Sequence, residues 1–200
     1  MKVLYIEARK KASLNLEKLR ELEKLLSSKI VIAYSIQYES LANQLKANLS
    51  KSIKIISFSQ VLGCSNLKSL HPILYIGSGR FHAINLALSS GQEVFIFDNT
   101  ISKVESAEVE KIKSRERGKY LKFLSSQSIG LIVSTKSGQE RFKQAISLKK
   151  QFKDKKSYIF LADNINSGEL ENFSIESWVN TACPDISNDS SILNYDKLKK

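Results

Sequence analysis

Two cysteines are the residues of this chain best suited to metal chemistry. Cys64 ends the sequence Q-V-L-G-C, and Cys183 lies in N-T-A-C-P. Each follows a predicted strand with a small residue beside it, which leaves room for a bulky ligand. Thiolates are the natural ligands of iron–sulfur clusters, although a single cysteine is more often a small buried apolar residue. Two cysteines exclude a disulfide framework and a zinc site built wholly from the cysteines of a single chain.

A polar turn that could bind an anion lies between a predicted strand and a predicted helix. It contains Gly77, Gly79, Arg80 and His82. Backbone amides at a helix start can bind a carboxylate or a phosphate. An ordinary tight turn explains the same glycines, and the third glycine of a dinucleotide-binding fingerprint is missing.

A second such turn runs from 134 to 141 and contains Gln139. Its amide, hydroxyl and basic groups suit an amino-acid-like ligand, whereas helix capping by Ser137 explains it equally well. Gln37 and Asp98 stand at the ends of two further predicted strands, where they could contact a ligand or cap a turn.

Several common kinds of site are absent from the sequence. His71 and His82 have no metal-binding partner three or four residues away, so a histidine metal site is not expected. The G-x-S-x-G elbow and the Walker loop are also missing, which excludes the commonest classes of hydrolases and of proteins that bind nucleoside triphosphates.

The elements that must position these residues alternate along the chain. Short β-branched runs separate longer segments with apolar residues at helical spacing, a pattern that predicts an α/β fold with parallel sheets. The predicted strands are Val3–Ile6, Ile30–Ser35, Ile53–Phe58, Ile73–Ile76, Val94–Phe97, Leu131–Ser134, Ser157–Leu161 and Trp178–Asn180. Helices are predicted around 14 to 26, 41 to 49, 81 to 88 and 142 to 148, with a long charged helix over 104 to 124.

The predicted strands form an internal repeat. Three positions in each half align at similar intervals, 28 and 22 residues against 27 and 20: Val3 with Leu131, Val31 with Tyr158, and Ile53 with Trp178. Both cysteines then follow a third strand, at the sheet edge where open α/β folds bind ligands. We expect two similar βαβ-type domains, residues 1–103 and 104–200, that bring Cys64 and Cys183 to one place.

The composition is that of a globular protein, with 31 Lys and Arg against 20 Asp and Glu, a net charge of +11 and 42% hydrophobic residues. Residues 101 to 160 hold 15 basic and 6 acidic side chains, and residues 161 to 200 hold 3 and 7. The basic segment could steer an acidic partner or RNA, or simply form a solvated helix face. Because no nucleic-acid motif accompanies it, we do not expect a nucleic-acid partner.

The chain is expected to be cytoplasmic and free of membrane contact. Its first residues lack the apolar region and cleavage site of a secretory signal. No uncharged apolar run approaches the roughly 18 to 20 residues that span a bilayer.

Four motifs, in this order, resemble landmarks of the diphthamide synthase family, the 2-(3-amino-3-carboxypropyl)histidine synthases that modify translation elongation factor 2. They are Q-V-L-G-C ending at Cys64, Y-I-G-S-G-R-F-H ending at His82, V-S-T-K-S-G-Q-E-R ending at Arg141, and W-V-N-T-A-C-P ending at Pro184. Together they span residues 60 to 184. The resemblance is to the second and third of the family's three similar α/β domains.

The resemblance implies a cofactor. In the family each domain gives one cysteine to a single 4Fe-4S cluster, whose open iron site binds S-adenosylmethionine. By this match Cys64 is the second-domain ligand and Cys183 the third-domain ligand, while the first-domain cysteine has no counterpart before Val3. Asp185 stands where the family tends to carry an arginine.

The resemblance also implies a reaction and a pocket. Reductive cleavage of S-adenosylmethionine yields a 3-amino-3-carboxypropyl radical that adds to C2 of a histidine imidazole. The residues expected around the ligand are Gln37, Gly77, Gly79, Arg80, His82 and Gln139.

Three interpretations follow from the missing first domain. The chain is one piece of a split synthase, completed by a separate chain that supplies the third cysteine or by a homo- or heterodimer. Alternatively, it is a non-catalytic accessory or electron-relay subunit of a synthase. The third interpretation is a cluster-free binding module of the same fold.

Overall fold

Strands buried along their whole length form the centre of the first sheet. The computed structural model of the chain describes residues 4, 6, 8–11, 13–63, 65–187 and 192–198. Every residue of β3 (Ile73–Ile76) and β4 (Val94–Phe97) is buried, as expected for central strands of a parallel sheet covered on both faces. The outer strand β2 (Lys54–Gln60) is mostly exposed.

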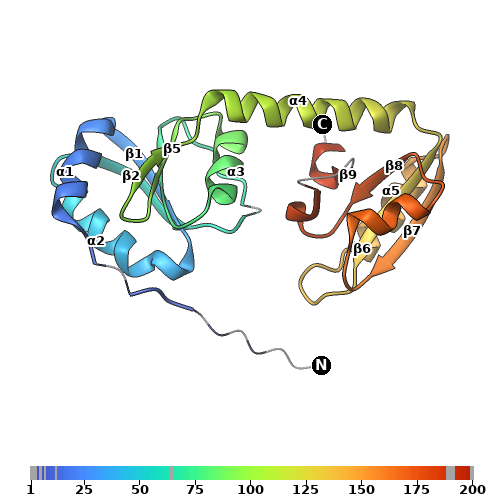
Figure 1. The fold of residues 1–200 in the computed structure, drawn as a ribbon, viewed down its shortest axis with the longest axis horizontal. Coiled ribbons are helices and arrows are strands. Elements are labelled where there is room, and N and C mark those ends of the chain that lie inside the picture. Colours follow the sequence, from blue (N-terminus) through green and yellow to red (C-terminus); the bar gives the residue numbers. More distant parts are fainter. Residues whose placement is uncertain are drawn as a thin grey trace. The chain divides into compact units, whose positions relative to one another are not determined.

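The chain divides into two compact units, Met1–Glu110 and Lys111–Lys200. The first unit holds a five-stranded sheet in the order β2-β1-β3-β4-β5, with β1 at Lys29–Tyr34 and β5 at Ile101–Lys103. Its helices are α1 (Leu16–Leu25), the 3-10 helix η1 (Ile36–Tyr38), α2 (Glu39–Leu49) and α3 (Arg80–Ser90). Figure 1 shows these elements in blue to green.

Alternate residues of β1 face opposite layers of the first unit. Ile30 and Ile32 pack with Leu22 of α1 and Leu45 of α2. Val31 and Ala33 pack on the other face with Ala83, Leu86 and Ala87 of α3. The sheet is therefore covered by helices on both faces, and the loops at its carboxyl edge are set by these packed layers.

The second unit holds a four-stranded parallel sheet in the order β7-β6-β8-β9. The strands are β6 (Ser128–Ser134), β7 (Lys156–Ala162), β8 (Ser177–Asn180) and β9 (Ile192–Asn194). The helices are α4 (Ser106–Ser125), which begins in the first unit, α5 (Phe142–Gln151), and the 3-10 helices η2 (Ser167–Asn172), η3 (Pro184–Ser187) and η4 (Tyr195–Leu198). Leu131 and Val133 pack with Ala145 and Leu148 of α5.

The predicted α/β class and seven of the eight predicted strands are confirmed, with shifts of a few residues at their ends. The eighth, Val3–Ile6, lies largely outside the described residues, and the two that are described, Leu4 and Ile6, are exposed and not in a strand. The sheets are not wholly parallel, because β5 runs antiparallel to β4. Of the described residues, none lies in a helix long and apolar enough to cross a membrane.

The predicted repeat exists, but its alignment is one strand out of register. Both sheets share the order second-first-third-fourth strand, so β1 corresponds to β6, β2 to β7 and β3 to β8. Val31 therefore matches the region of Leu131 rather than Tyr158. As a consequence, Cys64 follows the outer strand β2 whereas Cys183 follows β8, the counterpart of β3, and the two cysteines do not occupy equivalent loops.

Candidate active site

The carboxyl edge of the first sheet gathers most of the predicted ligand residues. Because β1, β2, β3 and β4 are parallel, the segments that follow them begin at one edge. Gln37 follows β1 in η1, the loop with Gly63 follows β2, and Gly77 to His82 follow β3 into α3. The fold thus brings these predicted residues together within the first unit.

The two glycines of the Gly77 turn have different physical roles. A Cβ on Gly77 would lie 2.4 Å from Tyr75 Oη and 2.9 Å from Ser35 Oγ, so the protein's own hydroxyls fill that space. Gly79 has φ +82°, a left-handed conformation that favours glycine, and open space where a side chain would be. Gly79 is the N-cap of α3 and offers no side-chain cap, so the first amides of this helix are free of side-chain capping.

Buried hydroxyls lie beneath this turn. Tyr75 is fully buried, and neither its Oη nor Ser35 Oγ has a hydrogen-bond partner of normal geometry among the residues described. Burial raises the pKa of the Tyr75 phenol, and the neighbouring Ser35 hydroxyl lowers it by a smaller amount. Burial beneath the turn therefore keeps the Tyr75 phenol protonated, and the Tyr75 and Ser35 hydroxyls are left with unused hydrogen-bonding capacity.

His82 and Phe81 fix α3 to its surroundings. The His82 ring stacks on Tyr75 with centroids 5.7 Å apart, and Phe81 meets His82 edge-on at 5.7 Å. Phe81 also fills the space beside Gly63, where a Cβ would lie 2.4 Å from its ring. The prediction that Gly63 leaves room for a ligand is therefore wrong, because the phenyl ring takes that space.

Asn85, one turn further along α3, was not predicted from the sequence. Its Nδ2 donates to the Gly63 carbonyl at 2.9 Å, so Phe81 and Asn85 together hold the loop that leads to Cys64. The signal that could have found them is their i, i+4 spacing, which places both on one face of the helix.

Arg80 contacts another helix. Its guanidinium pairs with Glu108 of α4, at 2.5 Å between Nη2 and Oε2, and this hydrogen bond raises the pKa of Arg80. Asp98 also has a local role, because its Oδ1 accepts from Thr100 N at 3.2 Å and Oγ1 at 2.6 Å in the turn before β5. Of the two roles considered for Asp98, the structure supports turn capping.

Gln37 is exposed, and its backbone carbonyl accepts a hydrogen bond from Lys10 N at 2.8 Å. Lys10 Nζ donates to the buried Tyr38 hydroxyl at 3.0 Å, and this bond raises the pKa of Lys10. Lys10 was not predicted, because no periodicity places an N-terminal segment against the sheet edge. It adds a cation at the same edge as Gln37.

The carboxyl edge of the second sheet holds Cys183 and the turn that contains Gln139. Cys183 is a free, half-buried thiol three residues after the end of β8. Gln139 follows the neighbouring parallel strand β6, is half-buried, and donates its N–H to Lys136 O at 3.0 Å. Ser137 does not cap α5, because the N-cap is Arg141.

Asn180 shapes the Cys183 loop and was missed by the sequence reasoning. It is 2% exposed; its Nδ2 donates to Cys183 O at 2.7 Å and to Asn194 Oδ1 at 2.9 Å, and its Oδ1 accepts from Ala182 N at 2.8 Å. An asparagine at the end of a fully buried strand is the signal that could have identified it. The loop that presents Cys183 therefore has a fixed backbone.

These observations test whether a cluster fits. An unlinked, half-buried thiol on a fixed loop suits a thiolate ligand of an iron–sulfur cluster. Cys64 lies outside the described residues, so its convergence with Cys183 stays a prediction. Within the described ranges, no three His, Cys, Asp or Glu side chains group closely enough to hold a metal ion.

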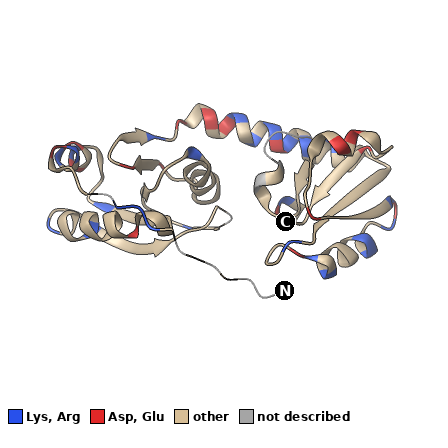
Figure 2. Ribbon diagram, turned by 60° about the horizontal axis from the view of Figure 1, so that its bottom comes forward, with Lys and Arg blue, Asp and Glu red and all other residues tan. Residues whose placement is uncertain are grey.

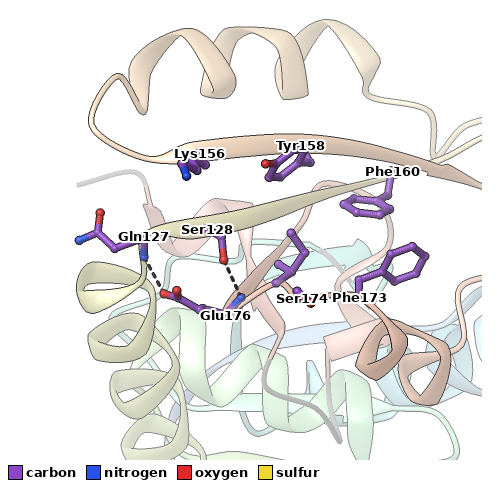
Figure 3. Close-up of a pocket in the computed structure, with 9 residues that line it drawn as sticks. Gln127, Ser128, Lys156, Tyr158, Phe160, Phe173, Ser174 and Glu176 are labelled. Carbon is purple, nitrogen blue, oxygen red and sulfur yellow. Dashed lines mark hydrogen bonds between the residues drawn. The ribbon is translucent and has the colours of Figure 1, made fainter.

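A groove of about 540 Å³ lies elsewhere in the second unit (Figure 3). Its walls include Ser128, Lys156 and Tyr158 at the amino-terminal ends of β6 and β7, and Glu176 just before β8. Glu176 Oε2 accepts from Gln127 N at 2.7 Å across its edge. The groove is thus at the sheet end opposite Cys183 and is separate from the candidate site.

Comparisons with known proteins agree with the motifs. The family model for diphthamide synthesis proteins matches residues 1–197. The chain belongs to this family. Its fold is similar to the crystal structure of Dph2 from Pyrococcus horikoshii with a 4Fe-4S cluster, with a TM-score of 0.75, 26% identity, and coverage of 90% of this chain and 58% of that chain.

Two named relatives extend the comparison. The 2-(3-amino-3-carboxypropyl)histidine synthase of Methanocaldococcus jannaschii is 31% identical over 179 residues, which are 82% of this chain and 47% of the relative. The corresponding synthase subunit 1 of Schizosaccharomyces pombe is 30% identical over 146 residues, 68% of this chain and 34% of that protein. The chain thus spans less than half the length of these curated relatives.

Proposed function

We propose that this chain is a subunit of a 2-(3-amino-3-carboxypropyl)histidine synthase that transfers the 3-amino-3-carboxypropyl group of S-adenosylmethionine to a histidine of translation elongation factor 2. The observation that carries the proposal is the family match over residues 1–197, which includes both cysteine motifs. The proposed domains are residues 1–103 with Cys64 and residues 104–200 with Cys183.

Cys64 and Cys183 would each hold one iron of a 4Fe-4S cluster. When bound, such a cluster supplies the electron that cleaves the sulfonium carbon–sulfur bond of S-adenosylmethionine. A third thiolate would come from a separate chain or another subunit, since this chain has no third cysteine.

The chain's own residues would bind and orient the methionine part of the substrate. The uncapped amides at the start of α3 attract a carboxylate, because a helix N-terminus carries partial positive charge. Gly79 leaves open space above this end of the helix, and Gln37, Arg80, His82 and Gln139 complete the proposed pocket. In this pocket the guanidinium of Arg80 would be oriented by its ion pair with Glu108.

The test is transfer of labelled 3-amino-3-carboxypropyl groups. The chain is reconstituted anaerobically with iron and sulfide, alone and with a separately expressed first-domain chain, and incubated with labelled S-adenosylmethionine and purified elongation factor 2. The proposal predicts labelled elongation factor in the mixture, and none when Cys183→Ser replaces the wild type. Absence of transfer from every combination would contradict it.

A second candidate function is an accessory subunit without catalysis of its own. The observation that favours it is the similarity to proteins named as subunit 1, which indicates relatives that work in multi-component synthases. In that case the chain would raise the transfer rate of a complete synthase. The Cys183→Ser variant of the chain would raise that rate as much as the wild-type chain does.

A further inference from the structure

The part of α4 that follows Glu110 is strongly basic. From Lys111 to Leu124 it carries six Lys or Arg side chains and one carboxylate, Glu116. Figure 2 shows these basic residues as blue segments along the helix. Lys119 Nζ pairs with Glu116 Oε1 at 2.7 Å, and both side chains are largely buried. The carboxylate of this stretch therefore already has a cation as its partner.

Of the other five cations, Lys113 is half-buried and the remaining four face solvent. Lys111, Arg115, Arg117 and Lys122 are exposed, and none forms an ion pair with a carboxylate in the described part of the chain. The positive charge of these four side chains is therefore not paired with any carboxylate of the described residues.

Helical geometry sorts the exposed residues into two stripes. At about 100° per residue, Lys111, Arg115 and Lys122 lie on one side of the helix. Arg117, Leu121 and Leu124 follow each other at i, i+4 and i+7 on another side. Leu121 is 64% exposed and Leu124 is 50% exposed, so the second stripe is mainly apolar, and the small exposed residues Ser114 and Gly118 lie between it and the basic stripe.

Structural explanations account for only part of this surface. A cation in the last helical turn stabilises the helix dipole, which explains Lys122 but not Lys111 or Arg115. A solvated face needs charge but not two adjacent exposed leucines. RNA phosphates would use the cations without the leucines. Tyr120 and Phe123, the aromatic residues of this stretch, pack into the second unit's core rather than offering a stacking face.

We infer that residues Lys111 to Leu124 of α4, here called the α4 docking surface, bind an acidic, partly apolar surface of the acceptor protein. The identity of that acceptor as elongation factor 2 rests on the proposed function. The cations steer the acidic acceptor and set the orientation of the encounter, and the leucines bury apolar area once it docks.

The test measures binding separately from transfer. The triple variant Lys111→Glu, Arg115→Glu, Arg117→Glu reverses the exposed charge while keeping good helix formers. The control, Arg20→Glu, Lys51→Glu, Lys54→Glu, makes the same net-charge change at exposed positions of the first unit. Circular dichroism verifies that both variants fold, and fluorescence anisotropy with labelled elongation factor 2 gives affinities at low and high salt.

We expect the α4 variant to bind elongation factor 2 about tenfold or more weakly at low salt, with a smaller difference at high salt, and the control to bind like the wild type. Leu121→Ser with Leu124→Ser should weaken binding equally at both salt concentrations. In the active mixture the α4 variant should raise KM and leave kcat unchanged.

Equal affinities for the α4 variant and the control would overturn the inference. So would binding of a 20-nucleotide duplex RNA that the α4 variant loses while its affinity for elongation factor 2 is unchanged. Failure of the proposed function has a different signature, because transfer would then be absent even from the wild-type mixture while binding is still measured.

Discussion

Asn180 is the buried polar side chain that defines the loop around Cys183. Its carboxamide bonds the Cys183 carbonyl, the Ala182 amide and Asn194, and burial denies these groups water as a substitute. Unpaired buried polar groups are costly, so this side chain stabilises both the unit and the position of the thiol.

We predict that Asn180→Ala lowers the free energy of unfolding of the second unit by about 2 kcal/mol, because buried donors and acceptors are left unpaired. Urea unfolding followed by Trp178 fluorescence measures this, since Trp178 is the chain's single tryptophan. Asn166→Ala, which removes an exposed cap of η2, is the control and should cost less. Equal costs for the two variants would contradict this role of Asn180.

Tyr75 gives the first unit a predicted pH dependence. Because burial raises its pKa in the folded state, the unfolded chain releases this proton first as the pH rises through about 10, and the folded state loses stability above that pH. Tyr75→Phe should remove this component, seen as a shallower alkaline decline of the melting temperature by circular dichroism. An identical decline in both proteins would show that Tyr75 ionises normally.

For single residues, the sequence indicates which loops carry the candidate site but not which side chains pack against those loops. Gly77 and Gly79 are identifiable as a special turn, and the reason for Gly77 lies in two hydroxyls, those of Ser35 just after β1 and Tyr75 in β3. The small residue Gly63 predicts space for a ligand beside Cys64, because nothing local reveals that Phe81, eighteen positions later, packs against it. Such contacts depend on the fold and not on neighbouring sequence.

At the scale of elements, long apolar runs were predictable and short pieces were not. β5 and β9 have three residues each, too few for a periodic pattern. β5 also depends on Asn99, whose φ of 75° reverses the chain after β4. The alignment of the two halves that spacing predicts is one strand out of register, because shifting it by one strand leaves similar intervals between strands. Spacing alone does not reveal which strand is central in each sheet.

Cross-strand packing provides a prediction at this scale. Gly130 of β6 pairs with Trp178 of β8, and a Cβ on Gly130 would lie 2.2 Å from the indole ring. Gly130→Ala should therefore destabilise the second unit by about 1 to 3 kcal/mol through overpacking.

The matched control is Gly118→Ala in the interior of α4, where a Cβ would meet no atom within 4 Å. It should stabilise the unit by up to about 1 kcal/mol, because alanine favours a helix over glycine. Urea unfolding by Trp178 fluorescence compares the two. Effects of the same sign would contradict the packing described for Gly130.

For the whole molecule, the chain contains two units of one repeated plan and spans 58% of the Dph2 chain it resembles. The family was predictable because four motifs follow one another in order between residues 60 and 184, and the α/β class because apolar runs alternate with helical spacing. The meeting of Cys64 and Cys183 stays a prediction, since local patterns do not fix how two units are placed. The proposed synthase function depends on that meeting.

Iron content tests this dependence most directly. The wild type, Cys64→Ser and Cys183→Ser are reconstituted anaerobically with the partner chain, and iron and sulfide are quantified together with the Mössbauer spectrum. We predict one 4Fe-4S cluster per wild-type chain and loss of most cluster iron from each serine variant, because each removes one of three thiolates. Full cluster content in either variant would contradict the assignment of that cysteine and, with it, the proposed function.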